Sequence, residues 1–174
     1  MEKKFTITAF TEDHIGLINR ITSVFARRHL NITSLTTSES EVQGVFRFTI
    51  VVHCTEDLII KVVGQLKKQV EIITADFHVD DELIHQEIAL YKINTKALAD
   101  DDHAERIIRQ YNARVLTVNP NFTVIEKTGH KAETQALLTE LRPFGVMEFV
   151  RSGRVAISKE LKDLSAILAQ LEEE

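Results

Sequence analysis

The chain has 174 residues, 44% of them hydrophobic and 27% charged, which is typical of a soluble globular protein. Its formal net charge of -5 argues against a nucleic-acid binder, because such proteins usually carry a basic face. The single cysteine, Cys54, excludes an intrachain disulfide and a CxxC zinc or redox pair. No signal peptide is visible, and no apolar run approaches the ~20 residues that cross a bilayer. We therefore expect a cytoplasmic protein without membrane contacts.

In the first half of the chain, alternating apolar residues predict strands, and apolar residues at helical spacing predict helices. The first helix follows a polar turn, Thr11–Gly16, in which Asp13 is the candidate N-cap. The predicted order is a strand at 5–10, a helix from 17 to about 29, strands at 31–37 and 45–54, a helix after Thr55, and a strand at 70–79.

After the acidic connector Asp80–Glu82, the same order of elements is predicted a second time. Asn119-Pro120-Asn121 is a strong turn signal between two short strands of this half. The predicted elements are a strand at 87–94, a helix at 104–111, strands at 114–118 and 122–127, a helix at 132–144, a strand at 146–150, a short apolar stretch at 155–157, and a C-terminal helix at 161–171.

Each half therefore has the order βαββαβ, which predicts an α+β fold with two ferredoxin-like domains, residues 1–80 and residues 81–174. In such a domain the helices pack on one face of an antiparallel sheet. The other face has to be covered, and a layer of helices or a second copy of the protein is the natural cover. We therefore expect an oligomer.

Catalytic motifs are missing from the sequence. The glycines form neither GxGxxG nor GxxxxGK[ST], and no histidine pair has HExxH spacing. His78 and His85, with three acidic residues between them, could hold a metal ion, but a solvated linker is the favoured interpretation. Cys54 ends an apolar strand and is expected to be a small buried residue. We expect neither catalytic residues nor a metal site.

The turn before the first helix is the best candidate for a ligand site. A helix N-terminus offers free N–H groups to a carboxylate, and Gly16 lets a ligand approach the backbone. Asp13 and Asn31 could bind an ammonium group, and Ile15, Leu17 and Ile32 could form apolar walls. These features fit a small aliphatic amino acid. Local chemistry alone favours a plainer interpretation, in which Asp13 caps the helix, Gly16 turns the chain and Asn31 ends the helix.

Several stretches carry a family resemblance. Residues 10–21 read FTEDHIGLINRI, and residues 24–36 read VFARRHLNITSLT. Glu87–Ile93, Asn119-Pro120 and Val150–Gly153 follow in the second half. Together these stretches resemble the small subunits of acetolactate synthase (acetohydroxyacid synthase), a family whose first domain is an ACT domain. The resemblance covers roughly residues 4–158.

The resemblance implies a regulatory subunit without cofactors of its own. Its partner would be a catalytic large subunit that uses thiamine diphosphate, Mg²⁺ and FAD, and that this chain would activate and make sensitive to valine in branched-chain amino acid biosynthesis. The effector would bind between ACT domains paired in a homodimer. The binding residues carried over by position are Asp13, His14, Ile15, Gly16, Leu17, Asn31 and Ile32.

The chain departs from the family pattern at three positions. Asp13 stands where the family commonly has Asn, Ile15 where it usually has Pro or Ser, and Ile18 where it commonly has Leu. These departures concern the identity and affinity of the effector. One alternative is a stand-alone ACT-domain sensor that regulates a different partner. Another is a ferredoxin-like enzyme or RNA binder. Acylphosphatase-type chemistry needs an Arg in the loop after the first strand, and this loop has none.

Overall fold

The structure is a computed structural model that describes residues 1–99, 102–161 and 163–172. The chain divides into two compact units. The N-terminal unit comprises Met1–His85 and Arg154–Glu174, and the inserted unit comprises Gln86–Gly153. The sequence predicted a single boundary at residue 80, with the whole C-terminal part in the second domain. The structure differs because the chain returns to the N-terminal unit after Gly153.

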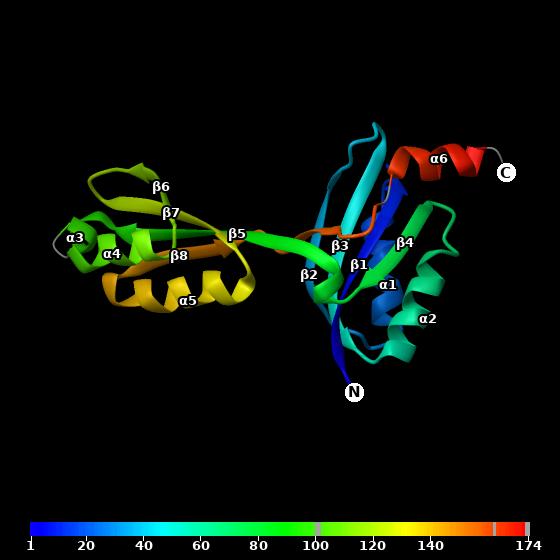
Figure 1. Cartoon of the computed structure of the whole chain (residues 1–174), viewed down its shortest axis with the longest axis horizontal. Helices are drawn as coiled ribbons and strands as arrows, with labels where there is room; N and C mark the ends of the chain where they lie inside the picture. Colours follow the sequence, from blue (N-terminus) through cyan, green and yellow to red (C-terminus); the bar gives the residue numbers. More distant parts are fainter. Residues whose placement is uncertain (100–101, 162, 173–174) are drawn as a thin grey trace. The chain divides into compact units, whose positions relative to one another are not determined.

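The N-terminal unit contains an antiparallel sheet with the strand order β2-β3-β1-β4 (Figure 1). Helices α1 and α2 connect the strands in the βαββαβ order that the sequence predicts. The elements are β1 (Lys3–Glu12), α1 (Leu17–Ala26), β2 (Ile32–Glu39), β3 (Val45–Cys54), α2 (Glu56–Leu66), β4 (Ile72–His78) and the short 3₁₀ helix η1 (Asp80–Glu82).

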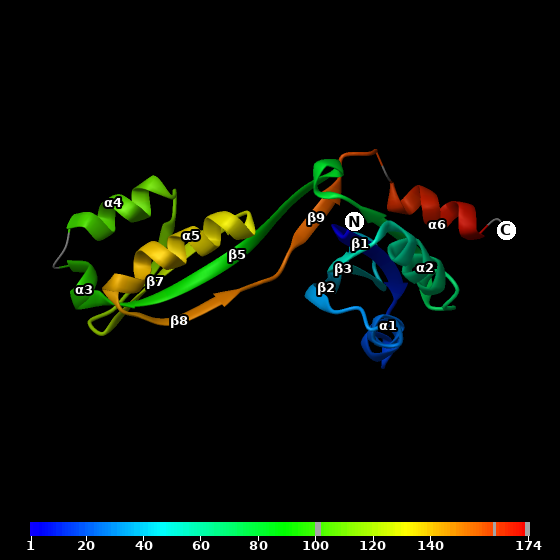
Figure 2. The ribbon, with the colours of Figure 1, turned by 90° about the horizontal axis from the view of Figure 1, so that it is seen from below.

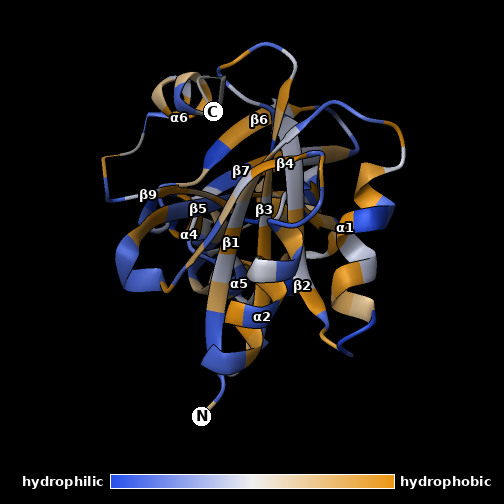
Figure 3. Ribbon diagram, turned by 90° about the vertical axis from the view of Figure 1, so that its right-hand side faces the viewer, coloured by the Kyte–Doolittle hydropathy of each residue, from blue (hydrophilic) through white to orange (hydrophobic). Residues whose placement is uncertain are grey.

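The core of this unit lies between the sheet and the two helices. Phe5, Ile7 and Ala9 alternate along β1 and are at most 2% exposed, and the apolar stripe of α1 packs against them. Figure 3 shows hydrophobic residues along β3 and on α2. Burying one side chain of this size stabilises the fold by about 1.5–3 kcal/mol. Helix α1 ends at Ala26, three residues before the predicted end, and His29 adopts a positive φ of 52° in the turn that follows.

The inserted unit repeats the arrangement with the strand order β6-β7-β5-β8. Helices α4 and α5 lie on one side of its sheet (Figure 2), where Tyr91, Ile125 and Leu137 are fully buried. The elements are β5 (Leu83–Asn94), α3 (Thr95–Ala99), α4 (Asp102–Gln110), β6 (Arg114–Val118), β7 (Phe122–Gly129), α5 (Lys131–Leu141), η2 (Arg142–Phe144) and β8 (Val146–Arg151). The predicted α+β fold with two ferredoxin-like domains is thus confirmed.

The chain then returns as β9 (Val155–Ser158), which pairs with β5, and ends in α6 (Leu164–Glu172). Arg154 fixes the start of this return segment, because its guanidinium donates to Asp80 Oδ1 at 2.6 Å and to Thr6 Oγ1 at 2.8 Å. The return segment and α6 cover part of the helix-free face of the N-terminal sheet, where Thr6 and Thr49 are at most 4% exposed. The sequence predicted a cover for this face, but not that the chain's own C-terminal part provides one.

The connector at Asp80–Glu82 is a short helix, and its Asp81 and Glu82 are exposed to solvent, as the sequence predicted. It forms η1, in which the carboxylate of Glu82 accepts a hydrogen bond from the amide of Val79 at 3.0 Å. His78 on β4 is 8% exposed, and His85 Nε2 lies 3.8 Å from Asp80 Oδ2. Among the described residues, no group of three or more His, Cys, Asp or Glu side chains could hold a metal ion. Likewise, no helix in the described part of the chain is long and apolar enough to span a bilayer.

Candidate functional site

The loop between β1 and α1 has a backbone conformation that depends on glycine. Gly16 occupies the N-cap position of α1 with φ 84° and ψ 2°, a left-handed conformation that L side chains rarely adopt. Apart from Gly16 itself and its two chain neighbours, no described residue has a heavy atom within 4 Å of the place where a Cβ would stand. The space beside Gly16 is therefore open to a ligand.

The first turn of α1 has no side-chain cap. The amide of Leu17 donates to His14 O at 3.3 Å, and that of Arg20 to Gly16 O at 3.2 Å. The amides of Ile18 and Asn19 have no acceptor in the part of the chain that the structure describes. Asp13 does not cap the helix, so the plainer interpretation of this residue is wrong. Free amides at the positive end of a helix dipole form a site for a carboxylate.

The loop side chains leave the site accessible. Asp13, His14 and Gly16 are exposed, and Ile15 is fully exposed. His14 Nε2 lies 3.0 Å from the carboxylate of Glu12, so its ring is held beside the strand end. Covering an aliphatic side chain that points into water, by a ligand or a partner, lowers the free energy of the protein.

Two predicted wall residues are placed differently from what the sequence indicated. Leu17 is 5% exposed, and its side chain belongs to the core and does not form an exposed wall. Ile32 is half-buried and packs on the same core, next to the exposed Asn31. Ile18, which was not among the predicted site residues, is 51% exposed and has one of the free amides. Its signal in the sequence was an isoleucine that lies off the buried stripe of α1.

A single copy of the chain does not bring all the predicted residues together. Ile32 pairs with Val52, which pairs with Phe5 near the start of β1. The loop follows the other end of β1, where Glu12 pairs with Val45. Asn31 and Gly16 therefore lie at opposite ends of the sheet, separated by about 25 Å at about 3.3 Å per residue along the eight-residue strand β2.

Cys54 is a buried free thiol, 2% exposed, as the sequence predicted. Burial raises the pKa of this thiol, and the nearby charge of Glu2 raises it further. A raised pKa keeps the thiol protonated, which is unfavourable for a nucleophile.

Comparisons with known proteins cover both units. A model described as the AHAS small subunit-like ACT domain matches residues 7–74, and one described as the small subunit of acetolactate synthase matches residues 86–160. An acetolactate synthase small subunit from Bacillus subtilis is 32% identical over 157 residues, which cover 90% of this chain and 91% of that protein. The chain belongs to the acetolactate synthase small subunit family.

Other members of the acetolactate synthase small subunit family show similar agreement. One from Mycobacterium bovis is 31% identical, over 90% of this chain and 93% of its own length. The crystal structure of the acetolactate synthase small subunit from Thermotoga maritima matches with a TM-score of 0.83 and 24% identity, over 92% of this chain and 99% of that chain. The structural match indicates a shared fold across the whole length of the family member.

Proposed function

We propose that this chain is the regulatory subunit of acetolactate synthase in branched-chain amino acid biosynthesis. It binds the catalytic large subunit, raises its activity and confers feedback inhibition by valine. The family assignment across both units supports the partnership. The uncapped, open N-terminus of α1 at Gly16 carries the proposal for an effector.

The proposed effector site is shared between two copies of the chain. Strand β2 lies at an edge of its sheet, with β3 as its only neighbour among the described residues. An antiparallel pairing of two β2 edges about a two-fold axis brings the start of one β2 beside the end of the other. The end of β2, at Glu39, is level with Thr11 and the loop that follows. Asn31 and Ile32 of one protomer then approach Gly16 of its partner.

The chemistry of this shared site suits a free aliphatic amino acid. The amides of Ile18 and Asn19 would receive the carboxylate. Asp13 of one protomer and Asn31 of the other would receive the ammonium group, and His14 is next to Asp13 in the loop. Ile15 and Ile32 would contact the aliphatic side chain.

Regulation would follow from a shift in populations. Valine would bind one arrangement of the dimer better than another, and the catalytic subunit would sense that arrangement through its contacts with this chain. Allosteric coupling of this kind is typically about 1–3 kcal/mol. Thiamine diphosphate, Mg²⁺ and FAD would be held by the catalytic subunit, and this chain would bring no cofactor and no catalytic residue. A free buried thiol at Cys54 suits the reducing cytoplasm where we place the assembly.

Reconstitution with a catalytic large subunit tests the partnership. We expect the two chains to co-purify and the acetolactate synthase activity to rise when this chain is added. If the catalytic subunit neither binds this chain nor gains activity from it, the chain is a sensor with a different partner.

Gly16→Asp tests the effector site. The new side chain would place a negative charge where the carboxylate binds, in a backbone conformation that disfavours it. We expect the affinity for valine, measured by titration calorimetry, to fall at least tenfold at this site, which is about 1.4 kcal/mol. Activation of the catalytic subunit should be retained.

Gly145→Asp is the matched control. Gly145 lies in the inserted unit with φ 77°, and it also has open space beside its Cα. The control therefore adds the same charge and similar backbone strain away from the loop, and valine binding should be unchanged. Equal losses in the two variants would contradict the assignment of the effector to the loop at Gly16.

A further inference from the structure

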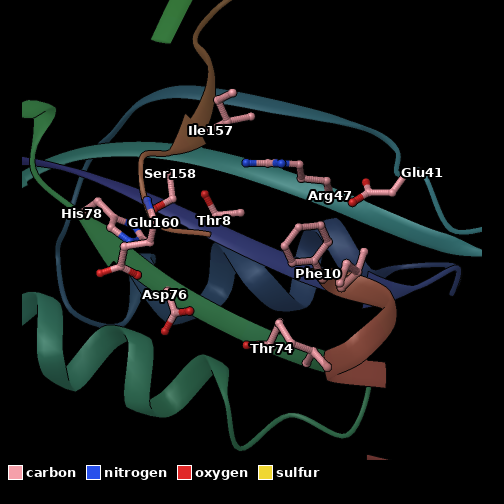
Figure 4. Close-up of a pocket in the computed structure, with 12 residues that line it drawn as sticks. Thr8, Phe10, Glu41, Arg47, Thr74, Asp76, His78, Ile157, Ser158 and Glu160 are labelled. Carbon is pink, nitrogen blue, oxygen red and sulfur yellow. The ribbon is translucent and has the colours of Figure 1, made fainter. Parts of the chain in front are cut away.

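A cavity lies between the helix-free face of the N-terminal sheet and the chain's own C-terminal part (Figure 4). Its volume is about 290 Å³, close to the lower limit for small-molecule sites. The sheet contributes side chains from β1, β3 and β4, and the cover contributes side chains from β9 and α6. All of these elements belong to the N-terminal unit.

The floor of this cavity is polar although it is covered. Thr8 pairs with Thr49 on one side and with Asp76 on the other, which places the three side chains on the same face. Nδ1 of His78, a residue that lines the cavity and is 8% exposed, is buried without a hydrogen-bond partner among the described residues. An ordinary apolar core does not leave such groups unpaired. The floor is therefore suited to a polar occupant.

Arg47 places a cation at one side of the cavity. Its guanidinium lies 5.3 Å from the ring centre of Phe10 and donates one hydrogen bond to Ala156 O at 2.5 Å. Its other N–H groups have no acceptor in the described part of the chain. Burial lowers the pKa of Arg47, while the nearby charge of Glu41 opposes this effect. A partly desolvated guanidinium binds a carboxylate strongly and in a fixed geometry.

The carboxylate of Glu41 also lines the cavity near Arg47, and two further carboxylates lie at the other side. Asp76 is on β4, two strand spacings or about 10 Å from β3, which carries Arg47. Figure 4 shows Asp76 and Glu160 on the side of the cavity away from the guanidinium of Arg47. Apolar side chains also line the cavity, Phe10 on the sheet and Leu164 on α6. Separated opposite charges with an apolar wall match a zwitterion that has an aliphatic side chain.

We propose that this cavity is a second binding site for a free aliphatic α-amino acid, with its carboxylate on Arg47, its ammonium group on Asp76 and its side chain against Phe10 and Leu164. The inference rests on the proposed function for the ligand class, but it places the ligand within one protomer and away from Gly16. A ligand here would contact the sheet and α6 together, so binding would stabilise the attachment of the C-terminal helix.

Titration calorimetry of the full-length chain with valine tests this proposal. The wild type should bind two equivalents per protomer, one at the loop and one in the cavity. Gly16→Asp should retain one equivalent, Asp76→Asn should also retain one, and the double variant should retain none. Isobutylamine is valine without its carboxylate and isovalerate is valine without its ammonium group, and each should bind Gly16→Asp at least tenfold more weakly than valine.

Lys67→Met is the matched control for Asp76→Asn. Lys67 Nζ lies 3.4 Å from Asp76 Oδ1, so both variants remove this ion pair, but only Asp76→Asn removes the carboxylate from the cavity. Lys67→Met should retain both equivalents. Thr8→Leu fills the floor while keeping Asp76, and it should lose the cavity equivalent.

Each outcome of this experiment has a consequence. If Gly16→Asp abolishes all valine binding, the cavity site is overturned and the proposed function stands. If wild-type binding survives Gly16→Asp and Asp76→Asn together, the cavity assignment is also overturned. If isobutylamine binds as tightly as valine, the cavity is a site for simple amines and the zwitterion is refuted. If the wild type binds a single equivalent that only Asp76→Asn removes, the effector site at the loop fails and the cavity site stands.

Discussion

Glu87 is a carboxylate in the core of the inserted unit, only 6% exposed. It accepts a hydrogen bond from Thr134 Oγ1 at 2.5 Å and lies 3.1 Å from Arg151 Nε. The neighbouring Tyr91 hydroxyl donates to Thr134 O at 2.6 Å, so β5, β8 and α5 are linked through polar side chains. A buried carboxylate is tolerated because its cation and its hydroxyl donor stay in place.

Arg151→Met should therefore destabilise the inserted unit. We expect the free energy of unfolding in urea to fall by about 3 kcal/mol, at the lower end for buried pairs because the Arg151 side chain is still 24% exposed. Replacing Glu87 with Gln in the same chain should recover part of the loss. Arg114→Met is the control: it breaks the exposed pair with Glu126, and it should cost less than about 1 kcal/mol. Equal losses for the two arginines would argue against a buried ionised Glu87.

Single residues of the candidate site were predictable where local chemistry decides them. The need for glycine at position 16 follows from the turn, and its φ of 84° confirms it. Leu17 could not be assigned from its neighbours, because a leucine that opens a helix can face either a ligand or the core. Leu17 is 5% exposed because it joins a core that includes Ile59, Val63 and Ile72, which are far along the chain. The distance between Asn31 and Gly16 likewise depends on strand register.

At the scale of elements, periodicity predicted the strongest segments to the residue. The strands at 45–54 and 114–118 have the predicted bounds, because alternation and turn residues mark both of their ends. The destination of the return segment had no such signal. It depends on single polar contacts over long sequence distances, such as that between Arg154 and Asp80. The apolar stripe of α6 predicted a helix but not the surface that Leu164 covers.

The attachment of the return segment should depend on pH through Asp80. Burial alone would raise the pKa of Asp80, but the hydrogen bonds and charges of Arg154 and Lys4 lower it to about 2, from an ordinary value of 3.8. A lowered pKa means that the ionised carboxylate stabilises the folded chain above about pH 4, and that this stabilisation is lost as the pH falls through 2.

Asp80→Asn tests this dependence. At pH 7 we expect it to lower the free energy of unfolding by about 1 kcal/mol, a value reduced for solvent screening because the Asp80 side chain is 35% exposed. The difference from the wild type should shrink between pH 4 and pH 2 in a series of urea titrations. Asp81→Asn, at the exposed neighbouring position, should stay within about 0.5 kcal/mol of the wild type. A difference for Asp80→Asn that stays constant down to pH 2 would contradict the role of its charge.

At the scale of the whole molecule, the two ends of β2 decide how many copies build the effector site. One copy keeps Asn31 and Gly16 at opposite ends of the sheet, and the edge position of β2 offers a way to bring them together across a two-fold axis. The unpaired backbone groups of an edge strand favour such a pairing. Two arrangements of the site, shared between protomers or contained in one, therefore make opposite predictions for mixed dimers.

A dimer of one Gly16→Asp protomer and one Asn31→Ala protomer, purified through two different tags, distinguishes the two arrangements. If each effector site is shared between the protomers, both changes fall on one of the two sites in the dimer. The other site then keeps an unchanged loop and an unchanged Asn31. Calorimetry should then detect one loop site per dimer, where either homodimer of variants has none. The reciprocal dimer pairs a wild-type protomer with one that carries both changes. If the sites are shared, this dimer has no intact effector site. If each site lies within one protomer, the wild-type protomer keeps one intact site.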